Sequence, residues 1–356
     1  MQLHLVLPGL LWPAKALHDC ARDLELPALG RLLGRGQHIW REALAPEDWL
    51  CREFNISTAG DSPLAAHGIA TEDSPLAALR LLGEGFDPGQ NIWLCADPSH
   101  LTFAQGRLIL GSQAPDLSDS EMQALLQALL PRVAQIPGFL QLRAGAAGSG
   151  YAYLQLASPP AMSTTPPSAA RGFSGAFSLP QGPQGPAWTR LGNEVQMLLH
   201  ALPQNQEREA AGRLAVNSLW FWGAGALPPA QAAQPPSYNK VLGDDALLGG
   251  LARWSHAAVG PLPASANDLP TEGTTLACVN DLALATQAMD ANRWRETLLR
   301  LERNWFTPIA AAFFSGRLKT LRLTALGPEA TLDIHLRGRD RFRFWKKPRP
   351  LATLLP

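Results

Sequence analysis

The chain has 356 residues, with 30 basic and 30 acidic side chains and a formal net charge of zero. This balance argues against electrostatic capture of nucleic acid or of an anionic membrane, so we expect neither as a partner. Apolar residues make up 46% of the chain and charged residues 17%, which excludes a disordered protein and allows two domains with large cores.

The four cysteines, Cys20, Cys51, Cys95 and Cys278, show no CxxC spacing. This pattern is typical of reduced thiols in a cytoplasmic protein. The apolar residues 1–8 lack the basic segment and the cleavage site of a signal peptide. No apolar run reaches the ~18 residues of a membrane span. We therefore predict a cytoplasmic protein with no membrane partner.

The first part of the chain predicts a strand, a short helix, a loop and then three further strands. Residues 3–7 are apolar and end at Pro8-Gly9, as a buried strand does. Residues 27–36 begin with Pro and end with Gly, which favours a short helix. Residues 56–75 are rich in small polar residues and predict a loop. Further strands are expected at 92–95, 108–110 and 151–156.

Two helices are predicted in the middle of the chain. Ser118 and Glu121 form a capping box, which opens a helix that we expect to end at Pro131. The Pro-, Gly- and Ser-rich residues 158–187 predict a long loop. An apolar stripe then predicts a second helix, with members Leu191, Val195, Leu198, Leu199 and Leu202.

The remaining elements continue an alternation of strands and helices. Residues 214–225 predict a strand ending in Gly223-Ala224-Gly225, and such turns often bind ligands at the carboxyl edge of an α/β sheet. Strands are expected at 276–279 and 321–323, with a helix at 294–305 between them. The sequence therefore predicts an α/β protein with a mostly parallel sheet flanked by helices.

The end of the chain alternates apolar and basic residues. Ile334 and Leu336 alternate with His335 and Arg337, and a similar pattern follows over 341–344. A turn at 338–340 would place Arg337 opposite Arg341 in a hairpin, 334–347, with one basic face. This face is either a solvated edge or a contact for an anion.

The stretch from 202 to 225 has the most specific pattern in the chain. It contains Leu202-Pro203-Gln204-Asn205-Gln206-Glu207-Arg208, Gly212, Val216-Asn217 and Gly223-Ala224-Gly225. Its order and spacing resemble, without a gap, a segment of archaeal-type cofactor-independent phosphoglycerate mutases of the alkaline phosphatase superfamily. The coinciding positions are Asn205, Arg208, Gly212, Asn217, Gly223, Ala224 and Gly225.

More narrowly, residues 97–101 and 193–200 resemble a proteobacterial group of RpfE-type regulatory proteins, which are described as phosphoglycerate mutase-like. The resemblance implies an alkaline-phosphatase-like α/β core formed by residues 1–90 and 203–356. It also implies an inserted, smaller α+β domain formed by residues 91–202.

Several positions depart from the pattern of these enzymes. The resemblance implies two divalent metal ions held by Asp and His at strand ends, and a Ser that is phosphorylated. Here Pro8 stands in place of an Asp, Thr324-Ala325 in place of Asp-His, and residues 47–51 contain no Ser. Asp281 is at most a relic ligand, and Trp222 replaces an Arg that would bind an anion. We therefore expect loss of the two-metal reaction, with no metal site and no cofactor.

Five residues are candidates for binding a ligand: Asp97, His100, Asn205, Arg208 and Asn217. Arg208 and its neighbours could hold a small anionic ligand, such as a phosphate or a carboxylate. Alternatively, Asn205, Arg208 and Asn217 brace the join between a helix and a strand. Asp97 and His100 are three residues apart. They form either an acid/base pair or a turn through Pro98.

Three functions remain open. The first is a pseudoenzyme that acts as a regulatory or ligand-binding protein. The second is a divergent metal-dependent phosphatase or phosphomutase for a small phosphorylated acid, with a rebuilt metal site. Such a site requires at least three of the following residues to converge: Asp48, Asp97, His100, Asp281 and His335. The third is a module that binds a protein, or less readily nucleic acid, through the basic hairpin.

Overall fold

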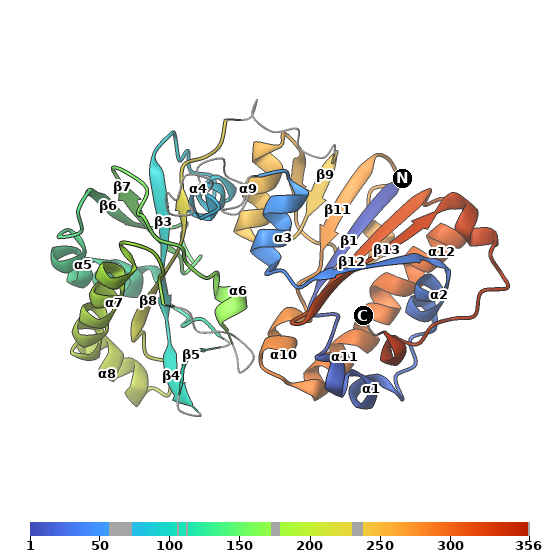
Figure 1. Ribbon diagram of the computed structural model, residues 1–356, viewed down its shortest axis with the longest axis horizontal. Helices are drawn as coiled ribbons and strands as arrows, with labels where there is room; N and C mark the ends of the chain where they lie inside the picture. The colour runs from blue at the N-terminus through green and yellow to red at the C-terminus, as the bar shows by residue number, and fades with distance from the viewer. Residues whose placement is uncertain (57–72, 105–106, 112, 172–178, 230–237, 355–356) are drawn as a thin grey trace. The chain divides into compact units, whose positions relative to one another are not determined.

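The computed structural model in Figure 1 describes residues 1–56, 73–104, 107–111, 113–171, 179–229 and 238–354. The chain forms two compact units. Unit 1 consists of Met1–Pro46, Ser237–Asp245 and His256–Pro356. Unit 2 consists of Glu47–Pro236 and Ala246–Ser255. In the described ranges, no helix is both long enough and apolar enough to cross a membrane.

The described strands of unit 1 form a seven-stranded sheet in the order β10-β9-β11-β1-β12-β13-β2. Their bounds are β1 Gln2–Pro8, β2 Gln37–Glu42, β9 Lys240–Leu242, β10 Ala258–Gly260, β11 Thr274–Cys278, β12 Thr320–Leu326 and β13 Ala330–Arg337. The first five strands in this order are parallel to one another. Strand β13 is antiparallel to both of its neighbours, β12 and β2. The prediction of an α/β fold with a mostly parallel sheet is confirmed.

One face of this sheet carries the apolar core of unit 1. In β1, the alternate residues Leu3, Leu5 and Leu7 belong to this core, as the two-residue period of a strand requires. They pack with the apolar sides of helices that lie against the sheet (Figure 1), namely α1 Ala14–Ala21, α2 Pro27–Arg35, α11 Ala291–Leu301 and α12 Thr307–Phe314. A short helix α10, Ala283–Gln287, and 3-10 turns at Ala266–Asp268, Gly338–Phe342 and Leu351–Thr353 complete the unit.

A π-helical turn, Glu302–Phe306, separates α11 from α12, whereas the sequence predicts one continuous helix there. This turn contains Glu302, which is buried and accepts hydrogen bonds from the backbone N–H groups of Ala28 (2.5 Å) and Leu29 (3.2 Å). The residue before α2 offers no capping side chain. Glu302 therefore satisfies N–H groups that the start of α2 leaves unpaired.

Unit 2 contains an antiparallel sheet in the order β6-β7-β3-β8 and a separate two-stranded sheet, β4-β5. The strand bounds are β3 Ile92–Ser99, β4 Leu101–Ala104, β5 Arg107–Leu110, β6 Phe139–Ala144, β7 Ala152–Leu156 and β8 Ser218–Gly225. The helix bounds are α3 Pro46–Glu53, α4 Leu76–Gly83, α5 Asp119–Val133, α6 Pro167–Ala170, α7 Gly185–His200, α8 Pro203–Ala210 and α9 Ala246–Trp254.

The helix α5 begins as predicted and ends later than predicted. Its capping box at Ser118 and Glu121 is confirmed. The prediction that it ends at Pro131 is wrong, because the helix continues to Val133. Leu129 and Val133 are fully buried and hold the last turn against the core of unit 2, which offsets the hydrogen bond that a proline removes.

The units differ from the predicted domain boundaries. Residues 47–90 and 203–236 were expected in the core domain, but both lie in unit 2. The physical reason is that β8 pairs along β3, while α4 packs against β8 and α9. Part of the predicted loop 56–75 falls outside the described residues.

The basic hairpin predicted over 334–347 is not formed. Strand β13 pairs with β12 on one edge and with β2 on the other, so no edge remains for the residues after the turn. Arg337 instead donates its backbone N–H to the Asp340 carboxylate (2.8 Å) at the start of a 3-10 turn. Consequently Arg337 lies opposite Thr320 in the sheet, and not opposite Arg341.

The crossing of α4 and α9 gives a test of the packing in unit 2. A Cβ atom added to Gly250 would overlap the carbonyl oxygen of Leu79, whereas one added to Gly249 would meet Gly83 at 3.7 Å, an ordinary contact. We expect Gly250→Ala to lower the free energy of unfolding by about 1–3 kcal/mol because it forces the helices apart. Urea unfolding measures the change.

The neighbouring Gly249→Ala is the matched control, since it makes the same chemical change in the same helix. It should be neutral or stabilising by up to about 1 kcal/mol, because alanine favours the helix. Equal effects of the two substitutions would contradict the close crossing.

Candidate functional site

The carboxyl ends of the parallel strands in unit 1 are the usual place for a ligand in an α/β sheet. Here β1 ends at Pro8, which lies opposite Leu326 of β12. The residues after it, Leu10, Leu11 and Trp12, are at most 5% exposed. The end of β1 therefore leads into apolar core, and its side chains offer no metal ligand.

Gly9 fixes the chain in this position. Its φ angle is +82°, and a Cβ atom would lie 2.7 Å from the carbonyl oxygen of Leu282. Its own carbonyl oxygen accepts hydrogen bonds from the Trp294 indole and the Thr286 hydroxyl, both at 2.8 Å. Nearby, Asp281 forms an ion pair with Arg300 (2.7 Å). The Gly9 carbonyl, after β1, and the Asp281 carboxylate, after β11, are therefore both bound by other groups of the protein.

Thr324, at a position where the resemblance implies a metal ligand, belongs to a buried chain of hydrogen bonds. Its hydroxyl lies 2.9 Å from His4 Nε2 and donates to Asp333 at 2.5 Å. The other ring nitrogen of His4 lies 2.7 Å from the Tyr238 hydroxyl. Arg322 donates to the same Asp333 carboxylate at 3.2 Å. The chain ties β1, β12 and β13 together on the face opposite the apolar core.

The residues that a rebuilt metal site requires do not converge. Within the described parts of the chain, no group of three or more His, Cys, Asp or Glu side chains is placed to hold a metal ion. Burial raises the pKa of Asp48 and, with the nearby arginines, lowers the pKa of His335. The described residues therefore do not reproduce the donor set that the mutase resemblance implies.

The two asparagines of the 202–225 stretch are bound to backbone. Asn205 donates to the carbonyl oxygens of Leu199 and Val216, both at 2.7 Å, and accepts from the Val216 N–H at 2.9 Å. Asn217 makes two bonds to the backbone of Leu101, at 2.7 and 2.8 Å. These bonds use both amide hydrogens of Asn205, so this side chain acts as a brace between α7, α8 and the segment before β8.

Arg208 is 3% exposed and faces carboxylates of its own unit. It donates to Glu121 (2.7 Å), to Asp116 (3.1 Å) and to the carbonyl oxygen of Leu214 (2.8 Å). Burial alone would raise the pKa of Glu121, but hydrogen bonds from the Ser118 backbone and from Arg208 lower it to about 2. Arg208 thus already holds anionic partners.

The Gly223-Ala224-Gly225 segment is part of β8 and not a turn at a sheet edge. A Cβ atom on Gly223 would lie 2.8 Å from Cβ of Leu76, so the glycine lets α4 approach the strand closely. The backbone N–H of Gly223 donates to the Thr164 hydroxyl oxygen (3.1 Å), and Thr164 donates through its backbone N–H and its hydroxyl to the Asp73 carboxylate. Internal groups of unit 2 therefore occupy the Gly223 donor.

Asp97 is paired with Arg80 of α4. The two carboxylate oxygens accept from the two terminal nitrogens of Arg80 at 2.7 and 2.8 Å, and one also accepts from the Trp222 indole at 2.8 Å. Arg80 is 4% exposed and its guanidinium lies over the ring of Tyr151 at 3.9 Å. It also donates to the Tyr153 hydroxyl at 2.8 Å. Asp97 is thus one half of a buried, bidentate ion pair.

His100 does not join Asp97. Its Nδ1 donates to the carbonyl oxygen of Ala215 at 2.8 Å, which ties the chain before β4 to the segment before β8. The cysteines offer no nucleophile nearby, because burial raises the pKa of Cys51 to about 12 and raises that of Cys95 as well. Of the two interpretations of this spacing, the acid/base pair is not assembled, and the turn through Pro98 is not formed because residues 97–99 belong to β3.

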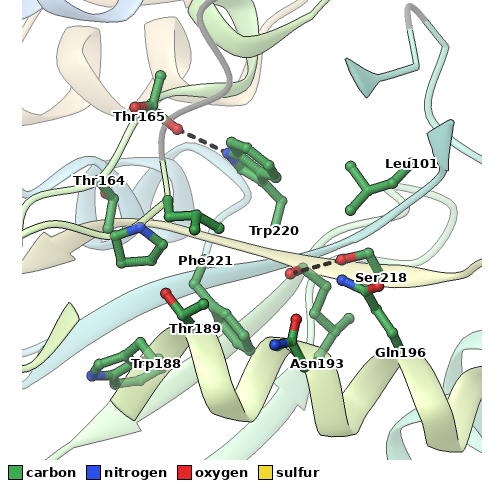
Figure 2. Close-up of a pocket in the computed structure, with 14 residues that line it drawn as sticks. Leu101, Thr164, Thr165, Trp188, Thr189, Asn193, Gln196, Ser218, Trp220 and Phe221 are labelled. Atoms are coloured by element: carbon green, nitrogen blue, oxygen red, sulfur yellow. Dashed lines mark hydrogen bonds between the residues drawn. The ribbon is translucent and has the colours of Figure 1, made fainter. Parts of the chain in front are cut away.

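Figure 2 shows a half-open pocket in unit 2 between α7 and β8. The volume inside its walls is about 60 Å³, and the pocket is open to solvent at its mouth. Trp188, Trp220 and Phe221 supply aromatic walls, and Gln196 and Asn193 are among the polar residues beside them. All of the described residues that line it are uncharged. Such a combination of apolar walls and few polar groups is typical of a small-molecule site.

Sequence reasoning missed Arg80, Asp73 and this pocket. The signal for Arg80 was present, because a single arginine in the apolar helix Leu76–Gly83 needs a buried partner. The pocket had a weaker signal, because Thr164, Thr165, Leu179 and Pro180 of its lining belong to the predicted loop 158–187, and long loops often line a site. Its aromatic residues come from two separate segments, and each is typical of a core residue when seen alone.

Comparisons with known proteins bear on the fold. No model of a known protein family matches the chain, and no curated protein matches it. The structure is similar to that of the PH0037 protein from Pyrococcus horikoshii, with a TM-score of 0.51, 14% sequence identity, and coverage of 99% of this chain and 91% of that chain. This likeness shows a shared fold.

A second solved structure is the cofactor-independent phosphoglycerate mutase from Thermoplasma acidophilum DSM 1728. The match has a TM-score of 0.45 and 16% identity, and it covers 94% of this chain and 89% of that chain.

The Arg80–Asp97 pair gives a stability prediction. We expect Arg80→Met to lower the free energy of unfolding by about 3–5 kcal/mol, because it leaves the Asp97 carboxylate buried without its partner. Adding Asp97→Leu should recover part of this loss, since no unpaired charge then remains. Chemical denaturation measures both variants. Arg190→Met, at an exposed position of α7, is the control and should change stability by less than about 0.5 kcal/mol.

Asp73 gives a prediction for pH. Burial raises its pKa to about 6, although its hydrogen bonds oppose this. Because the folded-state pKa is above the ordinary value, the folded protein binds the proton more tightly than the unfolded chain does. Stability from this group is present at low pH and is lost as pH rises from about 4 to about 6, by up to about 3 kcal/mol.

The measurement is the free energy of unfolding against pH for the wild type and for Asp73→Asn. The difference between the two curves should change across this window and be flat above it. Asp268→Asn, which makes the same change at an exposed site, should run parallel to the wild type. A parallel curve for Asp73→Asn would show that this carboxyl group titrates normally.

Proposed function

We propose that the chain is a phosphoglycerate mutase-like protein that does not carry out two-metal phosphoryl transfer and acts as a regulatory or ligand-binding protein, in the manner of the RpfE-type group. The observation that carries this proposal is the surroundings of two positions where the resemblance implies metal ligands. Pro8, at the end of β1, leads into buried apolar residues, and Thr324, within β12, is hydrogen-bonded to His4 and Asp333.

The occupied anion-binding groups support the same proposal. In the stretch that resembles the mutases, Arg208 is paired with Glu121 and Asp116, and the Gly223 N–H donates to Thr164, which in turn donates to Asp73. A phosphorylated substrate would have to displace these internal carboxylates. Each displacement would leave a carboxylate without its partner at a cost in free energy.

The test is metal analysis together with a mutase assay. Purified protein incubated with Mn²⁺ and then desalted should retain no stoichiometric metal, and 3-phosphoglycerate should remain unconverted. An active cofactor-independent mutase in the same assay is the positive control. Stoichiometric metal together with turnover of 3-phosphoglycerate would refute the proposal.

A further inference from the structure

The pocket between α7 and β8 has walls of fixed geometry. Trp188 and Phe221 are each less than 9% exposed and meet edge to face, with ring centroids 5.2 Å apart. Trp220 is held by a hydrogen bond from its indole to the carbonyl oxygen of Thr165 (2.8 Å), which Figure 2 shows as a dashed line. Rigid aromatic walls of this kind favour a flat, apolar ligand, because ring contacts need no rearrangement of the protein.

One side of the pocket offers hydrogen-bonding groups without protein partners. Thr189, Asn193 and Gln196 project from the same side of α7 in Figure 2. Within the described residues, none of these three side chains forms a hydrogen bond to another part of the protein. A hydroxyl and two amides can both donate and accept, so they suit a neutral polar group on a ligand.

The absence of charged residues among the described lining of the pocket also limits the class of ligand that it can bind. All of the described residues that line the pocket are uncharged, and three of them are aromatic. An ionised ligand would lose hydration on entry and would gain no opposite charge in return. We therefore expect the pocket to discriminate against phosphates and carboxylates.

We propose that this pocket binds a small, flat, uncharged molecule, with its ring between the aromatic walls and a hydrogen-bonding group toward α7. The proposal deepens the proposed function, since it names the class of ligand that a non-catalytic, ligand-binding protein of this structure would take. No bond is made or broken in the ligand.

The experiment compares two fluorescent probes of similar ring structure. N-phenyl-1-naphthylamine is neutral, and 8-anilino-1-naphthalenesulfonate carries a sulfonate. We expect the neutral probe to bind the full-length protein with one saturable site, and the anionic probe to bind at least about tenfold more weakly. Equal affinities would overturn the proposal.

Two variants locate the site. Gly192 lines the pocket on α7, and a Cβ atom added there has no heavy atom within 4 Å. Gly192→Leu should therefore fill the pocket, weaken the neutral probe at least about tenfold, and leave the thermal midpoint unchanged or raised. Thr189→Leu should have the same effect on binding. Ala187→Leu, on the same helix but outside the pocket, is the control and should bind as the wild type does.

Wild-type binding by both Gly192→Leu and Thr189→Leu would show that the probe occupies another site and would overturn the proposal. Its failure is distinguishable from failure of the proposed function. Turnover of 3-phosphoglycerate would refute the non-catalytic function while leaving probe binding intact, whereas loss of probe discrimination would refute the pocket and leave the metal analysis as it stands.

Discussion

A buried guanidinium group needs a negatively charged partner, and in unit 2 Asp97 is the partner of Arg80. Asp97 binds it through both oxygens, Tyr153 accepts from its Nε, and Trp222 donates to the same carboxylate. These contacts connect α4 to β3, β7 and β8, so one side chain joins a helix to three strands. They also explain why a tryptophan is favourable at position 222. An arginine there, as in the mutases that the sequence resembles, would place a second positive charge beside Arg80.

In the stretch from 202 to 225, which resembles a segment of the mutases, the donor groups likewise bind internal acceptors. Arg208 faces Glu121 and Asp116, and the N–H group of Gly223 donates to the Thr164 hydroxyl. A sequence motif reports which groups are present, but it does not report what they bind. In this protein Arg208 of the motif holds internal carboxylates and Asn205 and Asn217 bind backbone groups, so the motif stabilises the fold. Among the described residues, Thr189, Asn193 and Gln196 line the aromatic pocket without a hydrogen bond to the protein.

Local signals in the sequence were sufficient for much of the fold. The first strand, the short helix α2 and the capping box at Ser118 were all predictable, because each depends on residues a few positions apart. The predicted hairpin at 334–347 is not formed, because β13 pairs with β12 on one edge and with β2, from a distant part of the chain, on the other. For the same reason, the site residues could be named from the sequence but their partners could not. Glu302 and Ala28, for example, are 274 positions apart.

The central place of β1 has a consequence for how the protein is made. Its two neighbours in the sheet are β11 and β12, which end at residues 278 and 326. A ribosome adds roughly 5–20 residues per second, so β1 waits on the order of 15–60 s for its second neighbour. Until β11 is complete, the apolar residues Leu3, Leu5 and Leu7 have neither neighbouring strand to pair with, and an unpaired apolar segment of this kind is a template for aggregation. The sheet of unit 2, complete by residue 225, can form long before. The speed of translation therefore bears on how much of the protein reaches its folded state.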